Sequence, residues 1–125
     1  MVEGCTAHNG VGNDLFSLAS SVRRIVCPSS NAYRVRDRIL EECLKFDKNN
    51  LFLVALGVTA KALVEELFLK GYRVIDIGNL DMEYEWYLRK ASQKEPLEKH
   101  KIVGVEANKK AGYDEYLDQV VCYIE

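Results

Sequence analysis

The chain has 125 residues, of which 48% are hydrophobic and 29% charged, and its formal net charge is −2. This length and composition indicate one globular domain, residues 1–125, and exclude a disordered or fibrous protein. The charges are spread along the chain without a basic block, so the sequence predicts no nucleic-acid-binding surface.

The N-terminal segment and the cysteines indicate where the protein works. The first ten residues lack the basic start and apolar core of a signal peptide. The longest apolar stretch, residues 51–57, is much shorter than the ~20 residues that cross a bilayer. The four cysteines are scattered, without a C-x-x-C pair or a histidine at metal-ligand spacing. We therefore predict a cytoplasmic protein with reduced thiols and no membrane span.

The first predicted strand with its helix lies in residues 24–44. Residues 24–27 are apolar and end at a proline, as a short buried strand does. Residues 29–31, Ser-Ser-Asn, offer N-cap side chains for a helix that continues to Leu44. Its apolar residues have the spacing of one helix face: Ala32, Val35, Ile39, Leu40 and Cys43.

Residues 51–57 are the second predicted strand, and their continuous apolar character is typical of a central parallel strand. Thr59 is expected to cap the helix that follows, and Gly71 stands where a helix-terminating glycine belongs. The predicted core face of this helix consists of Leu63, Val64, Leu67 and Phe68.

Residues 72–78 form the third predicted strand, followed by a helix from about Met82 to Ala91. Residues 101–105 are a candidate fourth strand. Residues 113–124 have helical spacing, and residues 14–20 are a candidate opening helix.

Strands that alternate with helices predict right-handed βαβ units. We expect an α/β fold, a Rossmann-like three-layer sandwich with a small, mostly parallel sheet of three to four strands. Ligands of such sheets bind beyond the carboxyl ends of the strands. The loops at residues 28–31, 57–60 and 78–83 are therefore the candidate site.

The loop Gly57–Ala60 opens a helix directly after the central strand. Glycine lets a ligand approach the backbone, and the free N–H groups of a first helical turn attract phosphate. The alternative is purely structural, because a strand-to-helix turn needs a glycine and a capping residue in any case.

Residues 78–87 combine three carboxylates with three aromatic side chains at the end of a strand. Asp81 and Glu83 could share one Mg²⁺ or Mn²⁺, but only if the helix starts late, because residues i and i+2 diverge on a regular helix. The alternative is that both carboxylates occupy a helix N-terminus, where negative charge is favourable.

Several of these segments, in order and at consistent spacing, resemble the GT-D-fold glycosyltransferases of bacteria. They are residues 28–32 (PSSNA), 57–60 (GVTA), 71–78 (GYRVIDIG) and 80–86 (LDMEYEW). The resemblance covers roughly Ile25 to Leu88 and becomes vaguer beyond it.

The resemblance implies transfer of a hexose such as glucose from a UDP-sugar donor to a bacterial surface glycan or glycoprotein. The family's D-x-E motif falls on Asp81 and Glu83, which would hold Mn²⁺ or Mg²⁺ against the donor diphosphate. Gly57 and Thr59 match the loop near the donor phosphates. Glu106 is a candidate acid/base, with an exposed surface glutamate as the alternative.

The chain departs from the family pattern at two positions and in length. Val58 replaces a proline, and Asn79 replaces a histidine at the donor-binding edge, where it can hydrogen-bond but not titrate near neutral pH. The chain resembles only the C-terminal half of the domain, so it is expected to pair with a missing N-terminal half or to form a homodimer. An inactive remnant, or a nucleotide-binding Rossmann-like module without transferase activity, is the alternative.

Overall fold

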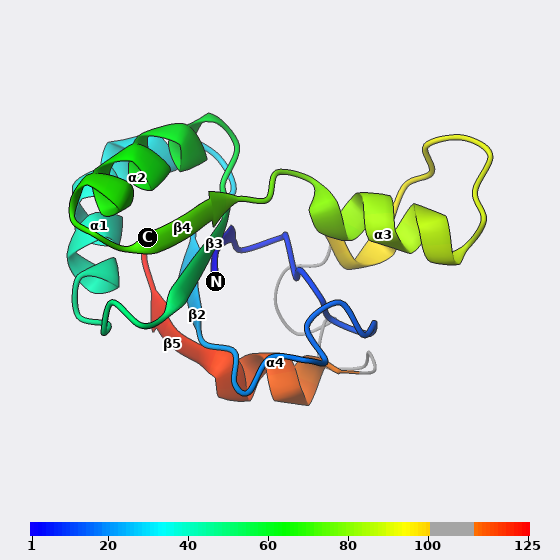
Figure 1. Ribbon diagram of the computed structural model, residues 1–125. Coiled ribbons are helices and arrows are strands. Elements are labelled where there is room, and N and C mark those ends of the chain that lie inside the picture. Colours follow the sequence, from blue (N-terminus) through cyan, green and yellow to red (C-terminus); the bar gives the residue numbers. More distant parts are fainter. Residues whose placement is uncertain (101–111) are drawn as a thin grey trace.

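The computed structural model describes residues 1–100 and 112–125, and its centre is a five-stranded parallel sheet (Figure 1). The strand order is β4-β3-β1-β2-β5, and every neighbouring pair is parallel. The strands are β1 Val2–Gly4, β2 Arg24–Cys27, β3 Leu51–Ala55, β4 Arg73–Asp76 and β5 Val120–Tyr123.

Helices lie on both sides of this sheet. They are α1 Arg36–Cys43, which follows the 3₁₀ turn η1 Ala32–Val35, then α2 Val58–Leu69, α3 Leu80–Leu88, the 3₁₀ turn η2 Glu98–His100, and α4 Tyr113–Gln119. Helices α1 and α2 lie side by side against one face, α4 lies on the other, and α3 extends beyond the end of β4 (Figure 1). In the part of the chain that the structure describes, none of these helices has the length and apolar character of a membrane span.

The main core lies between the sheet and helices α1 and α2. Alternate residues of the strands point toward the two helices, as the period of two in a strand requires. The strands contribute Val2, Ile25, Cys27, Phe52 and Val54, and the helices contribute Ile39, Cys43, Ala60, Leu63 and Leu67. Val64 packs at the margin of this core, whereas Phe68, predicted to belong to it, is 69% exposed.

A smaller core on the opposite face completes the three-layer arrangement. Val26 points away from α1 and α2 and packs with Val11, from the loop after β1, and with Tyr116 of α4. The predicted α/β fold with a parallel sheet is therefore confirmed. The predicted count of three to four strands is wrong, because the described residues contain five.

The two unforeseen strands are β1 and β5. Strand β1 has only three residues and carries a charged Glu3, yet it is wholly buried between β2 and β3. Strand β5 occupies residues that were predicted to continue a helix to residue 124; the helix ends at Gln119. The run from Val120 to Tyr123 leaves the helix because its backbone pairs with β2 and its residues favour strands.

One further predicted element needs correction, and another lies outside the described residues. Residues 14–20 form consecutive turns instead of a helix: the side-chain oxygen of Asn13 accepts the N–H of Leu15, and Leu18 is fully exposed, so no apolar face forms. The candidate strand at residues 101–105 falls outside the described residues.

The N-terminus of α2 differs from the prediction, whereas its C-terminus agrees with it. The N-cap is Gly57, with no side-chain cap, and Thr59 is buried inside the first turn, so the predicted cap at Thr59 is wrong. Gly71 ends the helix with a φ of +87°. Its N–H and that of Tyr72 donate to carbonyl oxygens of the last turn, as in a Schellman motif.

Leu67 and Phe68 are neighbours in α2, but Leu67 is buried and Phe68 is 69% exposed, so substitutions at the two positions test which of them belongs to the core. Leu67→Ala should lower the free energy of unfolding by about 2–5 kcal/mol, because it leaves a cavity in the main core. The matched control, Phe68→Ala, should change it by no more than about 0.5 kcal/mol. Urea unfolding followed by circular dichroism measures both, and equal losses would place Phe68 in the core after all.

Candidate active site

A cavity of about 400 Å³ lies at the carboxyl edge of the sheet. It is formed by the segments that follow three neighbouring strands, β1, β2 and β3. Its lining includes Thr6, Ser29, Asn31, Tyr33, Gly57 and Thr59. A second cavity, of about 320 Å³, lies at the amino ends of the strands around Arg23, Asn50 and Arg73. Parallel sheets bind ligands at the carboxyl edge, so the first cavity is the candidate site.

Gly57 gives this cavity an accessible backbone. Its backbone φ of +53° is one that residues with a side chain rarely adopt, and a Cβ placed on Gly57 would meet no atom within 4 Å. The residue is also the N-cap of α2, and no side chain occupies the cap. Val58 and Thr59, the first two residues of the helix, line the cavity beside Gly57, so an anion can approach their N–H groups, whereas the N–H of Ala60 donates to the Gly57 carbonyl.

The other walls of the cavity are tied together by Ser29. Its hydroxyl oxygen accepts the N–H of Thr6 at 3.0 Å and exchanges a second hydrogen bond of 2.8 Å with the Thr6 hydroxyl. A Cβ at Gly4 would lie 3.1 Å from the Cα of Ser29, so the two loops approach closely. The loops after β1 and β2 thus form one continuous wall.

The predicted site residues separate into two places. Gly57 and Thr59 line the cavity, and their contact with a donor stays a prediction from the sequence. Asn79 is exposed at the N-cap of α3 and does not line that cavity. Glu106 falls outside the described residues.

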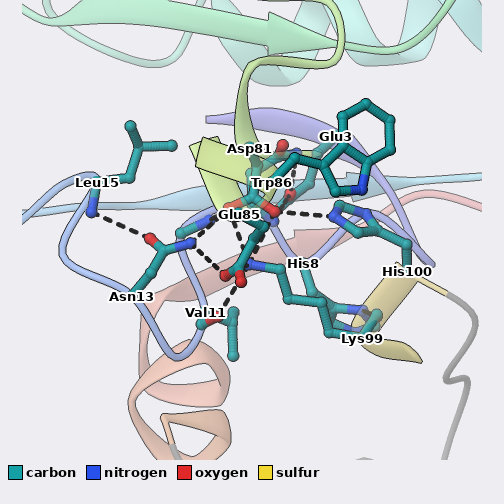
Figure 2. A network of polar contacts seen from close by, with 12 residues as sticks. Glu3, His8, Val11, Asn13, Leu15, Asp81, Glu85, Trp86, Lys99 and His100 are labelled. Atoms are coloured by element: carbon teal, nitrogen blue, oxygen red, sulfur yellow. Dashed lines mark hydrogen bonds and ion pairs between the residues drawn. The ribbon is translucent and has the colours of Figure 1, made fainter. Parts of the chain in front are cut away.

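Asp81, at the start of α3, is completely buried and holds several segments of the chain together (Figure 2). Its Oδ1 accepts hydrogen bonds from the N–H of Gly10 at 2.7 Å and the side-chain amide of Asn13 at 3.0 Å. Its Oδ2 lies 2.8 Å from both Lys99 Nζ and His100 Nε2. Helix α3 is thereby fixed to the loop after β1 and to η2.

Glu83 does not join Asp81. Helix α3 begins at Leu80, so the two carboxylates sit at i and i+2 on a regular helix, and Glu83 is exposed. The late helix start that would let them share one cation is absent. The carboxylate that lies with Asp81 is that of Glu85, one helical turn further on (Figure 2).

The described residues do not fit a resident divalent cation in this arrangement. Oδ1 of Asp81 already has three hydrogen-bond partners and Oδ2 has two, and the Lys99 ammonium contacts both oxygens. Among residues 1–100 and 112–125, no group of three His, Cys, Asp or Glu side chains is arranged to hold a metal ion. The requirement for Mn²⁺ or Mg²⁺ stays a prediction from the sequence.

The hydrogen bonds to Asp81 determine its charge. Burial by itself would raise the pKa of this carboxyl group, but the hydrogen bonds from His100, Lys99, Gly10 and Asn13 outweigh burial and lower the pKa to about 2. Asp81 is therefore an anion at neutral pH. It is a structural counterion and is unsuited to act as a general acid.

A second buried network joins the centre of the sheet to α4. Glu3 of β1 forms an ion pair with Arg24 of β2, and the second Glu3 oxygen accepts two hydrogen bonds from Asn9, at 2.7 and 2.9 Å. Arg24 also donates to Gln119 at 2.7 Å and stacks over the ring of Tyr116 at 4.8 Å.

Sequence reasoning missed these network residues because their partners are far apart in the chain. The one local signal was the charged Glu3 inside the apolar sequence Met-Val-Glu-Gly, since a charge in a buried strand needs a partner. Nothing local indicated that Lys99 and His100 would meet Asp81.

An α/β domain with a concave site at the carboxyl edge of a parallel sheet is an architecture common among enzymes that bind nucleotides. The family model of the glycosyltransferase GT-D fold matches residues 1–105, so the chain belongs to that family. The resemblance found in the sequence is confirmed.

Named relatives and solved structures agree with this assignment. The chain is 50% identical over 94 residues to "Probable glycosyl transferase Gly" of Streptococcus gordonii, a match that covers 75% of this chain and 14% of that protein. It is 46% identical over 86 residues to "Glycosyltransferase GlyD" of Streptococcus pneumoniae serotype 4, covering 69% of this chain and 11% of that protein.

A solved structure described as the highly conserved domain of unknown function 1792, with a distinct glycosyltransferase fold, has a TM-score of 0.86 and 43% identity to this chain. It is matched over 99% of this chain and 46% of that one. A new glycosyltransferase of the same domain type from Streptococcus sanguinis has a TM-score of 0.86 and 39% identity, over 99% of this chain and 47% of that one. The chain therefore spans less than half the length of these solved structures.

Acid titration tests the role of Asp81. Its pKa falls from 3.8 to about 2 on folding, so its ionised form stabilises the native state above pH 3.8, and this contribution disappears as the pH falls toward 2. The free energy of unfolding should therefore drop by roughly 2 kcal/mol over this range from Asp81 alone.

Denaturation at several pH values measures this effect. Asp81→Asn should flatten the pH dependence below pH 4, while the matched control Glu83→Gln, at an exposed position, should leave it unchanged. A carboxyl carbon of Asp81 that titrates near pH 4 in the native protein by NMR would contradict the assignment.

Proposed function

We propose that the chain forms part of the donor site of a GT-D-fold glycosyltransferase, which transfers a hexose such as glucose from a UDP-sugar to a bacterial surface glycan or glycoprotein. The observation that carries this proposal is the open backbone of Gly57 at the N-terminus of α2, inside the carboxyl-edge cavity. Family membership and the names of the relatives support it.

The cavity has the chemical features that a nucleoside diphosphate needs. The N–H groups of the first turn of α2 and the positive end of the helix dipole attract the diphosphate. Across the cavity, the half-exposed ring of Tyr33 offers an aromatic surface for a base or a sugar. The guanidinium of Arg36 lies 4.9 Å from the centre of that ring and adds positive charge nearby.

Transfer requires that the leaving UDP be stabilised as it gains negative charge. In this chain the helix N-terminus at Gly57 is positioned for that role, since it lies in the cavity and carries no side-chain cap. We also propose a cytoplasmic location, supported by the absence of any disulfide among the four cysteines.

The second candidate is a nucleotide-binding module without transferase activity of its own. It is favoured by length, since the chain covers 46% and 47% of the solved structures described above. The exposed edge strand β4, where Ile75 is 50% exposed, supports a partner such as the remaining half of the domain or a second copy of the chain.

Two glycines allow a controlled test of the donor site. Gly57 and Gly78 have φ values of +53° and +50°, and a Cβ at either meets no atom within 4 Å. Gly57→Ala and Gly78→Ala both place a side chain at a positive φ without a steric clash, but only Gly57 lines the cavity. Gly57→Ala should weaken UDP-glucose binding at least tenfold, or about 1.4 kcal/mol, and Gly78→Ala should not.

Isothermal titration calorimetry with UDP-glucose measures both variants against the unchanged protein. Equal affinities of the two variants for UDP-glucose would show that the donor does not bind in the cavity at Gly57. Failure of the unchanged chain to bind UDP-glucose or UDP would contradict the proposed function as a whole. Binding without release of glucose, in the presence of an acceptor glycan, would favour the module without transferase activity.

A further inference from the structure

The ammonium group of Lys99 lies in a cage of oxygen atoms. It is 2.8 Å from Oδ2 and 2.9 Å from Oδ1 of Asp81, 3.0 Å from Oε1 of Glu85, and 3.0 Å from the carbonyl oxygen of Val11 (Figure 2). Two carboxylates and a backbone carbonyl are the oxygen ligands that Mg²⁺ and Ca²⁺ take in proteins. Here these oxygens surround a lysine.

This cage is largely enclosed, and its two carboxylates face two cations: Lys99 inside it, and Arg89, whose guanidinium lies 3.6 Å from Oε2 of Glu85. The side chains of Asp81, Glu85 and Lys99 are 0%, 13% and 14% exposed. The buried Asp81 carboxylate needs a compensating cation, and Lys99 supplies it from 18 residues further along the chain. Asn13 donates to both carboxylates, at 3.0 and 2.7 Å, and fixes them on either side of the ammonium.

We infer that Lys99 is the built-in cation of the Asp81–Glu85 carboxylate pair, and that its ammonium excludes a divalent metal ion from this position. The D-x-E motif is then a structural element in this chain: its aspartate binds an internal lysine, and its glutamate faces solvent. Because Lys99 occupies the cage, the unchanged protein should bind no Mn²⁺ between Asp81 and Glu85.

Removal of the ammonium should convert the cage into a metal site. Lys99→Met keeps the unbranched shape of the side chain but ends one atom short and has no ammonium, so the buried Asp81 carboxylate and the largely buried Glu85 carboxylate face the same space. A divalent ion can then neutralise both and bind the Val11 carbonyl, whereas the unchanged protein offers no such vacancy. The exposed Lys61 of α2 provides a matched control, Lys61→Met.

The experiment is a titration with Mn²⁺ alone, without any nucleotide sugar, followed by electron paramagnetic resonance of the free ion and by thermal unfolding. Lys99→Met should bind about one Mn²⁺, and its Tm should rise by roughly 5–10 °C at an Mn²⁺ concentration a hundredfold above Kd. The unchanged protein and Lys61→Met should show neither effect.

Two outcomes would overturn the inference. One is stoichiometric Mn²⁺ binding by the unchanged protein that is lost in Asp81→Asn, because the metal would then displace Lys99. The other is a folded Lys99→Met variant that neither binds Mn²⁺ nor gains Tm when Mn²⁺ is added. If Lys99→Met does not fold without metal, its refolding on addition of Mn²⁺ supports the inference, and its failure to refold opposes it. The double variant Asp81→Asn with Lys99→Met should fold and bind no Mn²⁺.

The inference bears on the proposed function without depending on it. If Lys99 is the resident cation and the donor proposal holds, UDP-glucose should bind equally well with EDTA and with Mn²⁺. Because the Mn²⁺ titration uses no donor, failure of donor binding leaves its result intact. The two proposals can therefore fail separately.

Discussion

The ion pair between Asp81 and Lys99 determines how the carboxyl edge of this domain is arranged. A buried carboxylate without partners is costly, so the chain must bring cationic and polar groups to it. Those groups come from the loop after β1, which supplies Gly10 and Asn13, and from η2. Helix α3 consequently has one position relative to the sheet, although it packs little apolar surface of its own: Asp81 is its one buried residue.

The ion pair of Glu3 and Arg24 has the same role deeper in the sheet. It joins the two central strands, and Arg24 extends the connection to α4 through Gln119. Among the described residues, no buried side-chain nitrogen or oxygen atom lacks a hydrogen-bond partner. Complete pairing matters because a partly satisfied buried network destabilises a fold. Both networks lie outside the cavity around Gly57, and none of the described residues that line this cavity is charged.

The sequence predicted those parts of the fold that depend on local pattern. The continuous apolar run of β3, the helix face around Leu63 and the terminating Gly71 each depend on neighbours a few residues away, and each was found. Strand β1 was missed because three residues with a central glutamate carry no strand pattern. The candidate site was predictable only in part, since the strand-to-helix turn at Gly57 is signalled locally, whereas Lys99, the partner of Asp81, lies 18 residues away and is set by tertiary contacts.

The strand order has a consequence for how the chain folds. Strand β2, at residues 24–27, has β1 on one side and β5 on the other, and β5 is made only at residues 120–123. During synthesis one edge of β2 therefore stays without its neighbour until almost a hundred further residues have left the ribosome. Such distant parallel pairing slows folding and exposes a template for association with other chains. The open edge of β2 therefore stays available for association with other chains until β5, close to residue 125, pairs with it.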